Sequence, residues 1–181
     1  MASAFTHAFV ALSLGKVYTA ERMPLRFWVL SAACAVLPDA DVIAFAFGIP
    51  YGDMLGHRGF THSLLFALLT ACAVVALAFR DLAKGTGKTA ALVFYFFVVT
   101  ASHAVLDALT NGGLGVAFFA PFDNTRYFFP VRPVEVSPIG VGSFFSERGL
   151  AVLASELLWL WMPSALIVLT VVAWRKQGRT R

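Results

Sequence analysis

The stretch from Thr89 to Leu109 reads TAALVFYFFVVTASHAVLDAL. It is almost entirely apolar, and it is about as long as the helix of ~20 residues that crosses a bilayer. Near its end lie a histidine and an aspartate, His103 and Asp107, which are four positions apart and therefore share one face of a helix. The stretch predicts a membrane helix with two metal-ligand side chains on one face.

The rest of the chain has the same character. Of its 181 residues, 59% are hydrophobic and 13% are charged, and the mean hydropathy is +0.78, far above that of soluble domains. Further spans are predicted at Phe27 to Pro50, Thr61 to Phe79 and Leu150 to Trp174, with a shorter one at Ala4 to Ala20. The sequence therefore predicts an all-α integral membrane bundle of about five transmembrane helices, forming a single domain over residues 1–181 in which 150–174 is an anchor.

The basic residues indicate how the bundle is oriented. Ten of the fourteen lie in three clusters: Lys16, Arg22 and Arg26; Arg80, Lys84 and Lys88; Arg175, Lys176, Arg179 and Arg181. With five spans the three clusters lie on one side, which the positive-inside rule makes cytoplasmic. The N-terminus and residues 111–146 are then periplasmic and the C-terminus is cytoplasmic. The net charge of +4 predicts contact with membrane lipids at the inner leaflet, so membrane lipids are the expected partners and nucleic acid is not.

Ionisable residues within the predicted spans are few, and such residues usually serve a function. The set is His7, Asp39, Asp41, His57, His62, His103 and Asp107. At ~1.5 Å per residue, Asp39 lies roughly 20 Å from Arg26 and His103 roughly 22 Å from Lys88, the nearest basic residues on the inside. In a hydrocarbon core ~30 Å thick, the set gathers at one level in the outer third.

Two local motifs favour a polar site at this level. Pro38 interrupts an apolar span just before Asp39, and a broken helix at membrane depth is tolerated only against protein or a wet cavity. The segment GHRGFTHS from Gly56 to Ser63 predicts a glycine turn that carries His57, with Thr61 as the N-cap of the third helix.

These donors indicate the metal. Imidazole and carboxylate without thiolate favour zinc, with manganese or magnesium as alternatives. Because the donors exceed the four that one structural zinc needs, one or two ions are expected, and a two-metal site with open positions is a hydrolytic arrangement. The predicted ligands are His7, Asp39, His62, His103 and Asp107.

Several of these motifs, in this order, resemble a known family. They are Thr6-His7, Leu37-Pro38-Asp39-Ala40-Asp41, the run from His57 to Ser63, His103 to Asp107 with Thr110 to Gly113, and Arg126 to Pro133 leading to Ser137-Pro138. The chain resembles the YdjM-like, LexA-regulated, membrane-bound metal-dependent hydrolases of bacterial inner membranes. The resemblance implies a metal-dependent hydrolase whose histidine and aspartate pattern is similar to that of zinc-dependent phospholipase C.

The resulting hypothesis is hydrolysis of a phosphoester of a lipid or lipid-linked substrate at the outer face of the cytoplasmic membrane. Asp41 and His57 are predicted as general base or as support behind the metal ligands. Arg58, Arg126 and Arg132 are predicted to clamp a phosphate, with Arg58 among the catalytic residues. The aromatic segment 118–133 suits the interface or a lid over a head group.

Two other classes remain open. A metal-ion or proton-coupled transporter would use the same residues, although the inner halves of the spans offer almost no polar groups to continue a path. A non-catalytic membrane protein with a structural metal site would differ from the enzyme in lacking open coordination positions.

Overall fold

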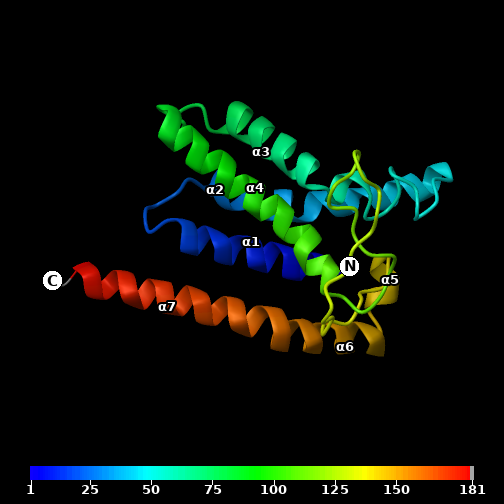
Figure 1. Ribbon diagram of the computed structural model, residues 1–181. Coiled ribbons are helices and arrows are strands. Elements are labelled where there is room, and N and C mark those ends of the chain that lie inside the picture. Colours follow the sequence, from blue (N-terminus) through cyan, green and yellow to red (C-terminus); the bar gives the residue numbers. More distant parts are fainter. Residues whose placement is uncertain (180–181) are drawn as a thin grey trace.

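The computed structural model describes residues 1–179, and these residues form helices and loops with isolated β-bridges but no strand (Figure 1). The predicted all-α class is confirmed. In chain order the elements are α1 (Ala4–Tyr18), α2 (Leu25–Val36), the 3-10 helices η1 (Leu37–Phe47) and η2 (Phe60–His62), α3 (Leu64–Ala78), α4 (Thr86–Ala108), α5 (Val141–Phe144), α6 (Glu147–Glu156), the π-helical η3 (Leu157–Trp161) and α7 (Met162–Arg179).

Three continuous helical stretches are long and apolar enough to cross a membrane: Leu25–Phe47, Thr86–Ala108 and Glu147–Gly178. The other two predicted spans are shorter than expected, since α1 and α3 have 15 residues each and rise only about 22 Å. The helix α3 begins after Ser63, whose hydroxyl accepts a hydrogen bond from Phe66 N–H at 3.0 Å. Thr61 is therefore not the N-cap, and that prediction was wrong.

The second span changes its winding at the proline. α2 ends at Val36, and η1 continues as a 3-10 helix from Leu37 until Gly48, which has a left-handed φ of 74°. Proline lacks the N–H that would continue the α-helical ladder, so the predicted break is observed. The tighter winding carries Asp39 and Asp41, both of which are buried.

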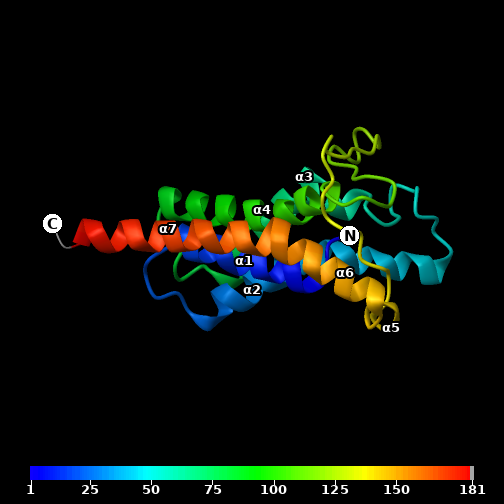
Figure 2. The same cartoon turned by 90° about the horizontal axis from the view of Figure 1, so that it is seen from below.

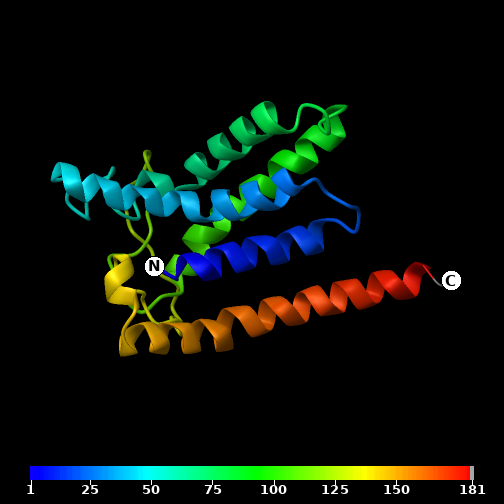
Figure 3. The same ribbon diagram turned by 180° about the vertical axis from the view of Figure 1, so that it is seen from behind.

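Polar and apolar residues are segregated along the bundle. The start of α1, η1, η2 and the end of α4 gather at one end, and the C-terminus lies at the other (Figures 1 and 3). A tightly packed aromatic core occupies the body of the bundle. The rings of Phe27 and Tyr95 stack with their centroids 4.7 Å apart, and Phe96 is fully buried. The buried histidines lie at the first end, as the depth argument predicts.

The C-terminal stretch is longer than the predicted anchor at 150–174. It begins at Glu147, contains one π-helical segment and runs beside α1 (Figures 1 and 2). Its π-helical segment η3 packs against α1, and the last residue of α6, Glu156, contributes a buried glutamate to the polar end of the bundle. The interpretation as a simple anchor is therefore incomplete.

Candidate metal centre

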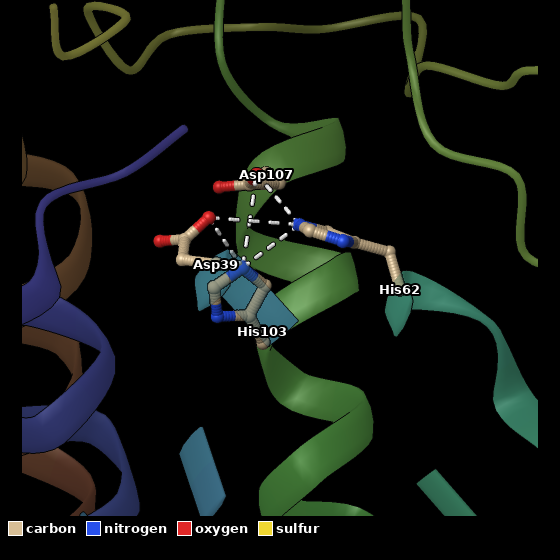
Figure 4. A group of neighbouring side chains, drawn as sticks. All are labelled: Asp39, His62, His103 and Asp107. Carbon is tan, nitrogen blue, oxygen red and sulfur yellow. Dashed lines mark hydrogen bonds and ion pairs between the residues drawn. The ribbon is translucent and has the colours of Figure 1, made fainter. Parts of the chain in front are cut away.

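Four buried side chains from three segments converge at the polar end (Figure 4). Asp39 comes from η1 and His62 from η2, and they approach His103 and Asp107 of α4 from opposite sides. The two Nε2 atoms of His62 and His103 are 3.0 Å apart. Asp39 Oδ1 lies 3.3 Å from His103 Nε2 and 3.7 Å from His62 Nε2, and Asp107 Oδ2 lies 3.9 Å and 3.6 Å from the same two atoms.

Hydrogen bonds behind the two imidazoles determine which nitrogens face this centre. His103 Nδ1 donates to the carbonyl oxygen of Ala35 at 2.7 Å. His62 Nδ1 lies 3.1 Å from Asp41 Oδ2, and the hydroxyl of Thr61 donates to that same oxygen at 2.7 Å. Each Nδ1 is therefore a donor, and in a neutral ring each Nε2 presents a lone pair to the centre.

The convergence of four acceptors requires a cation. Two lone pairs and two carboxylates within 4 Å repel one another unless protons or a metal ion lie between them. Zinc at ~2.0–2.1 Å from each ligand of a tetrahedron separates the ligands by about 3.3 Å. The five separations of 3.0–3.9 Å lie near this value, so the four residues could hold a metal ion.

His7, the fifth predicted ligand, lies beside this set. Its ring stacks on His103 with centroids 3.7 Å apart, and its Nε2 is 3.5 Å from Asp107 Oδ1, the carboxylate oxygen that points away from the centre. The side chain is fully buried and neither ring nitrogen has a hydrogen-bond partner. His7 therefore offers an imidazole nitrogen beside the four-residue centre. Among residues 1–179 it forms no second group of possible metal ligands.

Asp41 and His57 form the group behind His62. His57 Nδ1 donates to Asp41 Oδ1 at 2.6 Å, while Asp41 Oδ2 lies next to His62 Nδ1. These three residues also lie close enough to hold an ion. The His57 Nδ1 proton is directed at Asp41, and the Thr61 hydroxyl links His62 Nδ1, at 3.1 Å, to the other Asp41 oxygen. The group therefore orients His62, as carboxylates behind metal-bound histidines do.

Arg58 lies deep in the protein rather than open to a ligand. Its Nε is 3.1 Å from Asp107 Oδ2, and its two terminal nitrogens donate to Gly112 O and Thr110 Oγ1 at 3.0 Å each. The residue has a left-handed φ of 63° and is fully buried. All three guanidinium nitrogens thus contact the protein, so this geometry favours positioning of Asp107 over the predicted phosphate clamp.

The other two predicted arginines differ in their surroundings. Arg126 donates to the carbonyl oxygens of Tyr51, Asp53 and His57 at 2.9–3.1 Å, which ties residues 51–57 to the long loop. Burial raises the pKa of the Tyr51 phenol, whose ring lies edge-on to His57. Arg132 is exposed over the Phe128 ring, and no described contact joins it to the four-residue centre.

A buried network that the sequence pattern did not reveal supports the centre from the last helix. Glu156 accepts hydrogen bonds from the N–H and hydroxyl of Ser3 and from the hydroxyl of Thr6. Ser3 is the N-cap of α1, and the neighbouring Ala2 N–H donates to Asp107 Oδ1 at 2.7 Å. The only signal for it was an acidic residue, Glu156, within an apolar span.

The Glu156→Gln variant is expected to weaken this end of the fold. The amide keeps one acceptor but loses the charge that three donors share, and hydrogen bonds to a charged group contribute about 1.5–3 kcal/mol each. We expect the unfolding temperature in detergent to fall measurably, with no such fall in Glu147→Gln, an exposed glutamate of the same helix. Equal unfolding temperatures for the two variants would contradict a supporting role for Glu156.

Comparisons with known proteins agree with this architecture. The family described as YdjM inner membrane protein matches residues 1–179. A relative in Escherichia coli (strain K12), the inner membrane protein YbcI, is 35% identical over 177 residues, which cover 98% of this chain and 100% of the relative. No solved structure matches the chain.

Proposed function

Because the chain belongs to the YdjM family of inner membrane proteins, we propose that its buried histidine and aspartate centre serves a membrane-bound metal-dependent hydrolase. The observation that carries the proposal is the pair of imidazoles whose Nδ1 protons are directed away, so that both Nε2 atoms meet two carboxylates. Asp39, His62, His103 and Asp107 would hold the ion, zinc by preference, with His7 beside it. A bound zinc lowers the pKa of a water and polarises a phosphoryl oxygen.

The chain's own residues would divide the remaining work. Asp39 is the most exposed member of the four, at 7%, against at most 1% for the other three, so a substrate would approach from its side. The His57 and Asp41 pair, joined at 2.6 Å, can hold a proton next to His62. Arg58 fixes Asp107, and Arg126 fixes the loop that carries His57.

The substrate we propose is a phosphoester of a lipid or lipid-linked carrier. The depth of the centre supports this class, since the centre lies at one end of the membrane helices, where head groups are found. The basic clusters lie at the opposite end, where α1 ends, α2 begins and α7 ends. The site would then face the periplasmic leaflet.

Fusions of a compartment reporter test this orientation. We expect a fusion at Gly85, in the loop before α4, to report cytoplasm and a fusion at Gly113, after α4, to report periplasm, because positively charged loops remain inside. A periplasmic signal from Gly85 would invert the orientation and place the centre at the cytoplasmic leaflet.

Turnover tests the reaction itself. Purified protein in detergent is expected to convert a phospholipid or a polyprenyl phosphate to products visible by mass spectrometry, to stop with a chelator and to resume when zinc or manganese is added. Metal that chelation removes with a large loss of thermal stability, but with no product from any lipid, would favour the structural site instead. Uptake of metal into vesicles would favour the transporter.

A further inference from the structure

A cleft of about 340 Å³ opens beside the metal centre, between the start of α1, η1 and the segment that leads into α5. Its volume lies within the range of ~300–1,000 Å³ typical of sites for small ligands. In Figures 1 and 2, α5 and α6 lie at the same end of the bundle as the N-terminus. The lining residues are Met1, Ser3, Ala4, Phe5, Asp39, Val42, Ser137, Pro138, Ile139, Gly140, Phe144 and Phe145.

This cleft reaches the centre through one residue. Asp39 lines the cleft and is 7% exposed, while both of its carboxylate oxygens are buried toward the centre without a hydrogen-bond partner. The other three members of the centre, His62, His103 and Asp107, are at most 1% exposed. A ligand in the cleft would therefore meet the centre at Asp39.

The remainder of the cleft is apolar. Among residues 1–179, Asp39 is the one ionisable side chain that lines it, and no lysine or arginine of this part of the chain does. Phe5 and Phe145, at its rim, are 61% and 78% exposed, and Phe5 contacts Phe144 with ring centroids 6.0 Å apart. Such a largely apolar surface favours hydrocarbon, with Ser3 and Ser137 as its polar lining residues besides Asp39.

We infer that the cleft holds the hydrocarbon chain of a membrane lipid whose phosphate lies at the Asp39 edge of the centre. The occupant follows from the continuity between an apolar cleft and a centre of metal-ligand side chains, together with the position of both at one end of membrane helices. The reaction on that lipid rests on the proposed function, but the binding of the chain does not require turnover.

A photo-crosslinking probe can locate the chain. The probe is dodecylphosphonate with a diazirine near the end of its chain, added to the zinc-loaded protein in detergent. We expect crosslinks in residues 1–5 and 137–145 and at Val42, with labelling reduced severalfold by excess unmodified dodecylphosphonate. Inorganic phosphate, which has no hydrocarbon chain, should compete weakly.

Adjacent positions of η1 provide a matched pair of variants. Val42→Trp fills the cleft, while Ile43→Trp adds the same bulk at a 61% exposed position outside it. We expect labelling to fall at least fivefold in the first and to stay near wild type in the second. Ile139→Trp, on the opposite wall, should repeat the loss if Val42→Trp does not fold.

The outcomes separate this inference from the proposed function. A separate groove lies between α1 and α7, where Leu12 and Leu169 are among its lining residues. Labelling that maps to this groove, or that is equal in the wild type and both cleft variants, overturns the cleft assignment. Labelling as expected in a protein that turns over no phosphoester leaves the lipid cleft standing and removes the hydrolase.

Discussion

The Asp39→Asn variant is expected to lose its metal and its hydrolytic activity while its metal-free form unfolds at no lower temperature than the metal-free wild type. Asparagine keeps the shape of the side chain but weakens its donation to a metal. Replacing a direct ligand should cost more than the 10- to 100-fold in affinity that residues behind the ligands cost. Metal content after dialysis and thermal unfolding with chelator measure the two effects.

The thermal stability of this variant shows whether the native partner of Asp39 is a metal ion or a protonated histidine. Both oxygens of Asp39 are buried without a hydrogen-bond partner, so in the metal-free protein the charge costs free energy that asparagine would not. If protonated His103 were instead the native partner of Asp39, the substitution would destabilise the protein. Asp123→Asn, on an exposed loop, provides the control.

Asp107→Asn is expected to have a second, independent cost. Asp107 carries the charge that Arg58 Nε contacts at 3.1 Å, and both side chains are fully buried. Removing one partner of such a pair costs about 3–5 kcal/mol, because the other charge remains in a medium of low dielectric constant. Thermal unfolding with chelator present should therefore show a large fall that Asp39→Asn does not show.

A double-mutant cycle provides the matched test. In an Arg58→Met background the unpaired charge is already gone, so Asp107→Asn should cost far less there than in the wild type. Equal costs in the two backgrounds would mean that the pair is not coupled, and Arg58 would then be available for the phosphate-binding role that the sequence suggests.

Most of the centre was predictable because its ligands follow simple geometric rules. The spacing of His103 and Asp107 puts both on one face of α4, and Pro38 predicts the break that precedes Asp39. The depth of each residue, counted along its helix, places His62 at the same level. Helical rise and winding alone give these positions, and the sequence determines both locally.

The supporting contacts could not be predicted in this way. Arg58 reaches Asp107 because its own left-handed backbone turns the loop inward. The turn also needs Gly56 and Gly59, since a Cβ added to either residue would lie 2.1 Å from a backbone oxygen. The contact between Glu156 and Ser3 joins positions 153 residues apart. Such pairings depend on how helices pack, and apolar composition says little about which helix meets which.

The long separation between Ser3 and Glu156 also orders events during biosynthesis. A ribosome that adds about 5–20 residues each second needs roughly 8 to 30 s to synthesise the chain between them. During that interval the first helix, which carries His7, lacks its contact with Glu156, and α4 is completed before the interval ends. We therefore expect the start of α1 to reach its final position only after the chain has been synthesised past Glu156.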